Sequence, residues 1–256
     1  MPKPRLAWLS QGLSDAAPDE AWLSPREAVS VARLRFLRRR DAFRLGRWTA
    51  KKALALSLGR DATPDALRSI EIASAPDGAP VALVDGRPAG AALSLTGRAD
   101  QAVAFVGPYG TGLGCDLELV EPRSDAFVAD YLTPAEQRLV LMQDGEGREL
   151  AANLVWCGKE AALKVLRTGL RRDTRSVEVS FPPRGAGDDW APLSIRLAEG
   201  PVFTGWWRRF GEFVLALAAS EPFPPPPSLI EPPGLHRASP IESWLGAAER
   251  PAPHMK

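Results

Sequence analysis

The chain has 256 residues, 45% of them hydrophobic and 25% charged, and a formal net charge of +1. This composition is that of a globular protein with ample length for a buried core, and it excludes an intrinsically disordered chain. No apolar run approaches the roughly 20 residues of a membrane-spanning helix, so the sequence predicts no membrane segment.

The first half of the chain alternates strand and helix patterns. Residues 5–10 predict a short strand, and Ser24 followed by Pro25 is a typical start of a helix. The helical pattern continues to Leu58, with a break near a run of arginines, and ends at Gly59. Four strands are predicted next, in two pairs joined by turns, at 70–73, 81–84, 91–96 and 102–106.

The second half begins with an alternating strand at 113–120 and continues with helices. Residues 127–132 predict a short helix, and Thr133 with Glu136 forms a capping box that starts the next one. A long helical pattern covers residues 148–167. Four further strands are predicted, at 176–181, 193–197, 203–210 and 213–218.

Helices and strands are therefore mixed without regular βαβ alternation, which favours an α+β fold. No internal sequence repeat is apparent. From Pro222 onward prolines are frequent, and the sequence predicts an extended tail. Within this tail, Ser239 and Pro240 would start one short helix that carries Trp244 and Leu245.

Two segments carry the candidate chemistry. Asp116 and Glu118 alternate on the strand at 113–120, so both side chains leave the same face. Trp156, Glu160 and Lys164 are spaced i, i+4 and i+8 in the long helix, and a tryptophan on that stripe indicates partial burial. Three carboxylates and a lysine that meet at one point suit a hard divalent cation and a phosphate leaving group. A solvent-exposed strand face and an ordinary helix ion pair remain the alternative.

Histidine and cysteine exclude other classes of protein. The two histidines, His236 and His254, both lie in the proline-rich tail, so neither a Ser-His-Asp hydrolase nor a histidine-ligated zinc enzyme is expected. Cys115 and Cys157 are too few for a disulfide framework. Because the chain starts with no apolar segment of signal-peptide length, we expect reduced thiols and a cytoplasmic location.

Charge is unevenly distributed along the chain. Residues 33–52 hold nine basic residues and one acid, a local charge of +8 that leaves about −7 for the rest. Arg40, Arg44, Arg47 and Lys51 share one helical face, which suits an anionic ligand. A solvated face is the alternative. A nucleic-acid site is disfavoured, because no zinc-finger, RRM or helix-turn-helix pattern is present.

Together these segments resemble the 4′-phosphopantetheinyl transferases of the type that activates surfactin synthetase. In that family a Gly-(hydrophobic)-Asp-(hydrophobic)-Glu strand precedes, by about forty residues, a helix with Trp-x-x-Lys-Glu-Ala-x-x-Lys. Residues 114–118 (GCDLE) and 156–164 (WCGKEAALK) match both motifs at the right spacing. Gly169-Leu170 and the earlier arginine-rich helix pair also fit, and the resemblance covers about residues 20–218.

The resemblance implies two similar subdomains related by a pseudo-twofold axis, each a small antiparallel sheet with a packed helix. Their expected limits are residues 1–112 on the coenzyme A side and 113–221 for the metal and catalytic residues, followed by the Pro-rich tail at 222–256. Coenzyme A would lie in the cleft between the subdomains. The protein would be a monomer with no nucleic-acid or membrane partner.

The resemblance also implies a reaction and a site. A serine of an acyl- or peptidyl-carrier protein attacks the β-phosphate of coenzyme A, takes up 4′-phosphopantetheine and releases 3′,5′-ADP, with Mg²⁺ as cofactor. The metal ligands would be Asp116, Glu118 and Glu160. Glu160 would also act as a base, Lys164 would stabilise the departing phosphate, and Lys159 would add positive potential.

Two positions depart from the family pattern. Leu95 stands where the family usually has a histidine, and Ala79 stands where it usually has a lysine; both are phosphate contacts of coenzyme A in the family. Losing a charge-assisted hydrogen bond costs about 1.5–3 kcal/mol. The coenzyme contacts expected in this chain are Ser94, Thr96, Arg98, Arg40, Arg44 and Arg47.

Two hypotheses stay open from the sequence. The first is an active transferase with weakened recognition of the 3′-phosphate of coenzyme A. The second is a non-catalytic relative that binds a carrier protein or a nucleotide.

Overall fold

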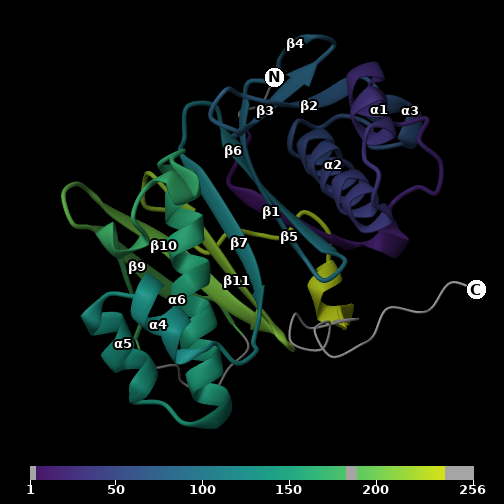
Figure 1. Ribbon diagram of the computed structural model, residues 1–256. Coiled ribbons are helices and arrows are strands. Elements are labelled where there is room, and N and C mark those ends of the chain that lie inside the picture. Colours follow the sequence, from purple (N-terminus) through teal and green to yellow (C-terminus); the bar gives the residue numbers. More distant parts are fainter. Residues whose placement is uncertain (1–3, 183–188, 240–256) are drawn as a thin grey trace, which may run out of the picture.

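The computed structural model describes residues 4–182 and 189–239. Helices are mixed with three antiparallel sheets in these residues, which confirms the predicted α+β fold. Figure 1 shows two halves side by side, each with one long helix packed on a sheet.

The first half contains two small sheets. Its helices and strands are, in order, β1 (Ala7–Gly12), α1 (Pro25–Ala32), α2 (Leu37–Ser57), α3 (Pro64–Leu67), β2 (Ile70–Ser74), β3 (Pro80–Val84), β4 (Arg87–Pro88), β5 (Ala91–Arg98) and β6 (Gln101–Pro108). The strand orders are β1-β6-β5 and β2-β3-β4, and β3 lies next to β5. Helix α2 packs across β1, β5 and β6.

The second half contains one larger sheet. Its helices and strands are β7 (Leu113–Leu119), α4 (Asp125–Tyr131), α5 (Pro134–Leu141), α6 (Gly145–Val165), β8 (Val177–Ser180), β9 (Ala191–Leu197), β10 (Val202–Phe210) and β11 (Phe213–Ala219). The strand order is β7-β11-β10-β9-β8, and α6 packs on β7 and β11.

Most of the predicted elements are present within a few residues of their expected limits. The predicted helix break near the arginine run is confirmed, because α1 ends at Ala32 and α2 begins at Leu37. The Ser24 hydroxyl caps α1, and the Thr133 hydroxyl caps α5, each with the carboxylate three residues later completing a capping box. The short elements α3 and β4 were not predicted from the sequence.

The two halves repeat the same topology, although no repeat is apparent in the sequence. When β3 is counted beside β5, the first half has the strand sequence β1-β6-β5-β3-β2 across its face. This corresponds, position by position, to β7-β11-β10-β9-β8 in the second half. Helix α1 corresponds to α5, and α2 to α6. The chain therefore contains a structural duplication, as the resemblance implied.

A buried ion pair holds each half together. In the first half the Lys51 ammonium lies 2.5 Å from the Glu27 carboxylate, and both side chains are fully or nearly fully buried. The same carboxylate accepts from the Ile72 backbone N–H at 2.9 Å, and Lys51 donates to the Trp22 carbonyl oxygen at 2.9 Å. One ion pair therefore joins α1, α2, β2 and the segment before α1.

The second half repeats this arrangement. The Lys159 ammonium lies 2.8 Å from the Glu136 carboxylate, which accepts from the Val179 N–H at 2.7 Å. Lys159 also donates to the carbonyl oxygens of Thr174 and Val177. Because the carboxylate and ammonium of such a pair satisfy backbone groups as well as each other, their desolvation is offset.

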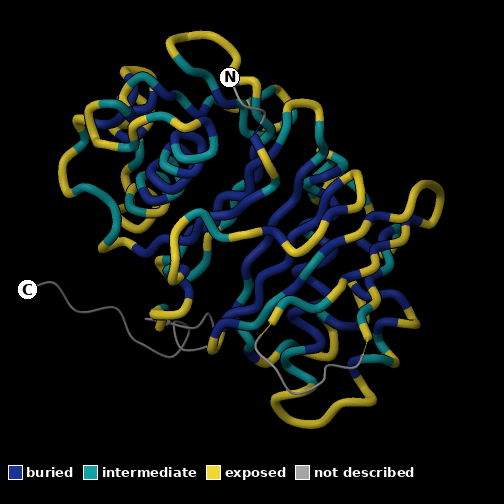
Figure 2. The backbone as a smooth tube through the Cα atoms, turned by 180° about the vertical axis from the view of Figure 1, so that it is seen from behind, coloured by how far each residue is buried: buried dark blue, intermediate teal, exposed yellow. Residues whose placement is uncertain are grey.

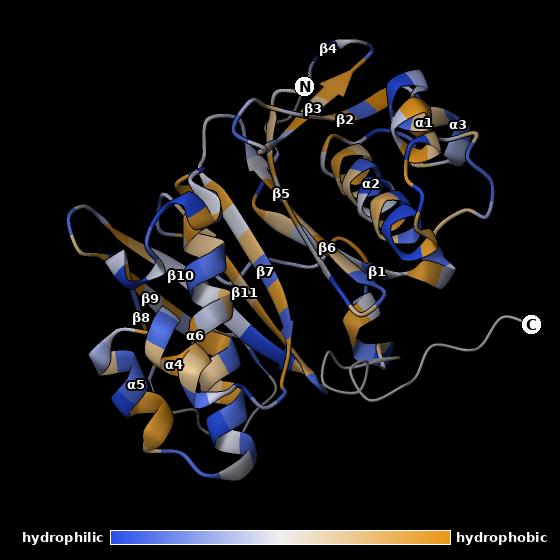
Figure 3. Ribbon diagram, viewed as in Figure 1, coloured by the Kyte–Doolittle hydropathy of each residue, from blue (hydrophilic) through white to orange (hydrophobic). Residues whose placement is uncertain are grey.

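The core follows from these packed layers. Figure 2 shows buried strands running through the middle of both halves, and Figure 3 shows those strands coloured largely hydrophobic while the helices carry both kinds of residue. Each long helix packs against its own sheet, and the middle of α6 (residues 151–159) is buried on every side. Within the described residues, none of the helices combines the length and the apolarity needed to cross a membrane.

The first part of the proline-rich tail packs on the body instead of extending away from it. The Trp8 N–H donates to the Pro227 carbonyl oxygen at 3.1 Å, and the Leu229 N–H donates to the Trp8 carbonyl oxygen at 2.8 Å. Phe223 and Leu235 are buried in the core between the halves. The helix predicted to start at Ser239 and Pro240, with Trp244 and Leu245, lies outside the described residues.

A surface contact joins the halves at one end. The turn between β2 and β3 presents Asp77, whose carboxylate pairs with Arg167 just past the end of α6 at 2.8 Å. Arg167 has φ +58°, the left-handed conformation, and the backbone bonds from Arg167 N–H to Lys164 O and from Thr168 N–H to Leu163 O form a Schellman motif. Glycine normally occupies this position, since a side chain there is strained.

This position yields a test of backbone strain. Replacing Arg167 by glycine should leave the protein about 1 kcal/mol more stable than replacing it by alanine, because both variants lose the Asp77 contact and only alanine retains the strain. Urea unfolding of the two variants measures the difference. Equal stabilities would contradict the left-handed assignment of this residue.

Candidate active site

Asp116 lies at the centre of the candidate site. It sits in the middle of β7, where its side chain faces α6 and the neighbouring strand β5. One carboxylate oxygen, Oδ1, accepts hydrogen bonds from the Lys164 ammonium at 2.8 Å and from the Thr96 hydroxyl at 3.1 Å. The other oxygen, Oδ2, is buried and has no hydrogen-bond partner among the described residues. A buried carboxylate oxygen in this state is a ready acceptor for a cation.

Glu160 and Lys164 reach the same point from α6. Burial, followed by the charge of Asp116, raises the pKa of Glu160 above its ordinary value, and Lys164 opposes the shift. Burial disfavours the Lys164 ammonium, yet the charge and hydrogen bond of Asp116 raise its pKa overall. Lys164 therefore stays cationic at neutral pH, while Glu160 is a stronger base than an ordinary carboxylate.

Glu118 has different neighbours from Asp116. Its Oε1 accepts from the Trp156 indole N–H at 3.1 Å, and its Oε2 accepts from Arg123 at 3.0 Å. Arg98 approaches Oε2 to 3.6 Å. Burial and the charge of Asp116 raise the pKa of Glu118 to about 7, and the two arginines only partly oppose this.

A second layer of polar groups, not foreseen from the sequence, supports these arginines. Arg123 donates to the Asn153 side chain at 2.6 Å, and Asn153 donates to the carbonyl oxygens of Glu121 and Glu149. Arg98 pairs with the Glu121 carboxylate. Asn153 lies one turn before Trp156 on the predicted stripe of α6, so helical spacing could have found it. Nothing in the pattern pointed to Arg123, which lies in an irregular connection.

Ser94 and Thr96, expected to contact coenzyme A, instead join the two halves. Figure 1 shows β5 running beside β7, and the two strands are in contact. The Ser94 hydroxyl accepts from the Cys115 N–H at 3.1 Å, and the Thr96 hydroxyl accepts from the Leu117 N–H at 3.3 Å. The serine is 3% exposed, so it has little surface left for a ligand.

The basic residues of α2 also have partners within the first half. Arg40 pairs with Glu20 at 3.1 Å, and Arg44 donates to the carbonyl oxygens of residues 17–19. Arg47 lies 3.9 Å from Glu27 and stacks on a neighbouring phenylalanine ring. The structure does not bring these three arginines into contact with the carboxylates of β7 and α6.

Lys159 is likewise not brought to the site. Its side chain is fully buried, points about a quarter-turn away from the Glu160 stripe of α6, and is held by Glu136. Burial lowers the pKa of Lys159, and the charge of Glu136 counteracts this. The structure therefore gives this lysine a role in packing α5, α6 and β8, in place of the electrostatic role expected from the motif.

The donor set suits Mg²⁺ if the ion uses few protein ligands. Among residues 4–182 and 189–239, no three acidic, histidine or cysteine side chains are arranged closely enough to hold one metal ion together. Mg²⁺ commonly takes one or two carboxylates and completes its shell with water and substrate phosphates. The unpaired Oδ2 of Asp116 and the nearby Glu160 carboxylate fit that pattern.

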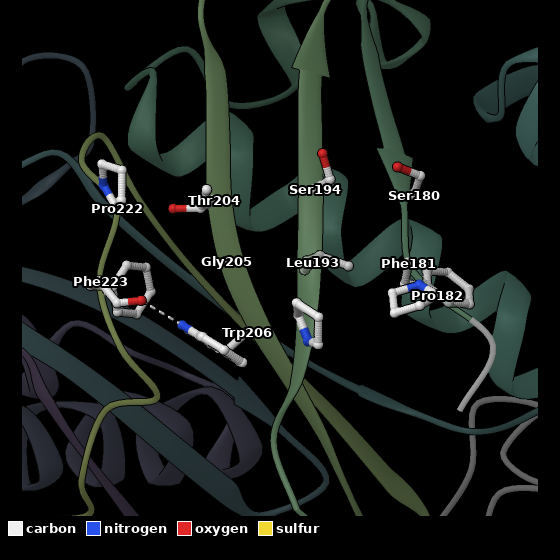
Figure 4. Close-up of a pocket in the computed structure, with 11 residues that line it drawn as sticks. Ser180, Phe181, Pro182, Leu193, Ser194, Thr204, Gly205, Trp206, Pro222 and Phe223 are labelled. Carbon is white, nitrogen blue, oxygen red and sulfur yellow. Dashed lines mark hydrogen bonds between the residues drawn. The ribbon is translucent and has the colours of Figure 1, made fainter. Parts of the chain in front are cut away.

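One surface depression formed by described residues lies away from this chemistry. It has a volume of about 580 Å³ and is mainly apolar. Figure 4 shows its lining side chains, which include Phe181, Trp206 and Phe223; they come from strands β8 to β10, the residues just after β8 and the segment after β11. None of its lining residues belongs to the carboxylate site.

Comparison with known proteins gives a match to one segment of the chain. Residues 112–188 match the sequence model of the 4′-phosphopantetheinyl transferase superfamily. This segment is less than a third of the chain, and it contains β7, α6 and all three carboxylates. The match indicates phosphopantetheine transfer in general. No curated protein matches the chain.

The structural role of Lys159 can be tested against that of Lys51. Lys159→Met should destabilise the protein by about 3–5 kcal/mol, because it leaves the Glu136 carboxylate buried without its cation. Lys51→Met is the matched control, since it breaks the equivalent pair in the first half and should lose a similar amount in urea unfolding. A Lys159→Met protein of unchanged stability would contradict the structural role.

The raised pKa of Glu118 predicts a pH dependence of stability. Since the folded protein holds this proton up to about pH 7 and the unfolded chain only to about 4.5, folding takes up a proton between these values. The free energy of unfolding should therefore fall as pH rises from 4.5 to 7, by at most about 3 kcal/mol, and then level off. Glu118→Gln should remove this component; unfolding curves with the same pH slope in both proteins would contradict it.

Proposed function

We propose that this protein transfers the 4′-phosphopantetheine group of coenzyme A to a serine of an acyl- or peptidyl-carrier protein, with Mg²⁺ as cofactor and 3′,5′-ADP as the other product. The supporting observation is the convergence of Asp116, Glu160 and Lys164, one unpaired carboxylate oxygen included, within the segment that matches the transferase superfamily.

Asp116 and Glu160 are the proposed holders of the metal ion. They come from different elements, β7 and α6, and the charge of Asp116 acts on Glu160 across the gap between them. When bound, Mg²⁺ would neutralise charge on the diphosphate of coenzyme A. The Thr96 hydroxyl and the Lys164 ammonium fix the Asp116 carboxylate through Oδ1, which keeps Oδ2 oriented away from them.

Glu160 and Lys164 would share the proton and charge transfers. With its raised pKa, Glu160 can accept the proton of the carrier serine as the serine oxygen bonds to the β-phosphorus. The bond from that phosphorus to the bridging oxygen breaks, and the leaving 3′,5′-ADP gains negative charge. Lys164, which stays protonated beside Asp116, can stabilise that charge.

Recognition of the 3′-phosphate is proposed to be weak. Leu95 and Ala79 supply no charge, and Arg40, Arg44 and Arg47 would have to leave partners within the first half to bind a phosphate. The basic helix and its exposed arginines still favour an acidic carrier protein by long-range attraction. A small preference for coenzyme A over dephospho-coenzyme A is the expected consequence.

The transfer is tested by the intact mass of apo carrier proteins of fatty-acid, polyketide and peptide type after incubation with this protein, coenzyme A and Mg²⁺. One added phosphopantetheine is expected, and Glu160→Gln should lower the rate at least about 100-fold because it removes both a metal ligand and the base. Glu149→Gln, three turns earlier on α6, is the matched control and should retain the rate.

Absence of modification on all three carrier types would contradict the transferase. Binding of a carrier protein or nucleotide without turnover would then support the non-catalytic alternative, which the missing histidine and lysine motivate. Undiminished turnover in Glu160→Gln or in EDTA would contradict the metal site while leaving the transfer itself standing.

A further inference from the structure

Glu118 occupies a junction between three parts of the molecule. It lies on β7, accepts from Trp156 of α6, pairs with Arg123 in the connection after β7, and lies close to Arg98 of β5 in the first half. No other carboxylate of the candidate site contacts all of these elements among the described residues. Its contacts therefore fix the position of α6 relative to both β5 and β7.

Both carboxylate oxygens of Glu118 are already engaged. One holds an indole N–H, and the other holds one guanidinium group and lies near a second. A metal ion that used Glu118 would have to share Oε1 with the Trp156 indole N–H or Oε2 with Arg123, and it would meet the positive charge of both arginines. This contrasts with Asp116, whose Oδ2 is buried and has no hydrogen-bond partner.

The two arginines are themselves held in place. Asn153 accepts from Arg123 at 2.6 Å, and the guanidinium of Arg123 stacks on the Phe127 ring at 4.8 Å. Arg98 is fixed by the Glu121 carboxylate. Neither guanidinium is a loosely placed surface group, since the two side chains are only 14% and 19% exposed.

Because the two halves have the same topology, each residue of the candidate site can be compared with the residue at the equivalent position of the first half. By helix position, Trp48 and Lys51 of α2 correspond to Trp156 and Lys159 of α6. By strand register, Gln11 of β1 takes the place of Glu118 on β7. The first half thus keeps a buried side chain of the same shape at the Glu118 position, although it lacks the charge.

At the positions of the two proposed metal ligands, Asp116 and Glu160, the first half has residues of different chemistry. Leu9 takes the place of Asp116, and Lys52 takes the place of Glu160. These substitutions remove metal-binding chemistry altogether. At the Glu118 position, therefore, the two halves share the shape and the buried polarity of the side chain. The pair Asp116 and Glu160 is present in the second half and replaced in the first.

We infer that Glu118 is a positioning residue, which anchors Arg123 and Trp156, and that the metal ion is bound by Asp116 and Glu160 without it. This inference rests on the proposed function for the identity of the metal site, and it reassigns one of the three carboxylates expected to be metal ligands. Arg123 becomes a positioning residue as well, because it holds Glu118 away from the metal.

The test measures Mn²⁺ binding at pH 8 with no coenzyme or carrier protein present. Electron paramagnetic resonance of the free ion monitors the binding. The proteins are the wild type, Glu118→Gln, Arg123→Gln and the double variant, with Asp116→Asn as the control that loses the site. Circular dichroism checks the fold of each. If Arg123→Gln does not fold, Arg98→Gln replaces it, because it frees the same carboxylate from the other side.

Glu118→Gln should bind Mn²⁺ within about threefold of the wild type, whereas Asp116→Asn should lose binding. Arg123→Gln should bind about tenfold more tightly, since it removes a positive charge and releases Glu118 toward the ion. That gain should disappear in the double variant. A purely structural arginine would not produce a gain that depends on Glu118.

Loss of Mn²⁺ binding by about 30-fold or more in Glu118→Gln would overturn the inference, because it would make Glu118 a direct ligand. A wild type that binds no Mn²⁺ would overturn the assignment of the metal to Asp116 and Glu160. The expected binding pattern in a protein that modifies no carrier would leave this inference intact and contradict only the proposed function.

Discussion

A buried lysine–glutamate pair, present once in each half, is the interaction on which the rest of the structure depends. Lys51 with Glu27 and Lys159 with Glu136 each connect a helix cap, a long helix and an edge strand through a single carboxylate. Removing one partner would leave a buried charge, so both must be kept together. The second pair anchors α6 to α5 and β8, and the neighbouring stripe of α6 with Glu160 and Lys164 faces β7, where the candidate site forms.

The two halves share this framework but differ in the residues at the matching positions of their long helices and first strands. The first half carries Leu9 and Lys52 where the second carries Asp116 and Glu160, so the proposed carboxylate pair is present in the second half and replaced in the first. The first half contributes instead through β5, whose Thr96 hydroxyl reaches Asp116 directly. The candidate site therefore lies where the two halves meet. Most of its residues come from the second half, and β5 of the first half holds them in place.

Local pattern was sufficient for most elements and for the central residues of the site. Period-two alternation placed Asp116 and Glu118 on one strand face, and helical spacing placed Glu160 and Lys164 on one stripe. The positions of Lys159 and Ser94 in the folded protein depend on which faces of the helices and strands pack together. Local sequence pattern does not predict that packing. The duplication was expected only from the family resemblance. No repeat is apparent in the sequence itself because few identities persist, chiefly Trp48 with Trp156 and Lys51 with Lys159.

The central claim is that one metal site serves the molecule, in the second half, between Asp116 and Glu160. Anomalous diffraction from crystals grown with Mn²⁺ and coenzyme A tests it most directly. One strong peak is expected beside the Asp116 Oδ2 and Glu160 carboxylates, with Glu118 still bound to Arg123. A peak in the first half, or the absence of any peak beside Asp116, would contradict it.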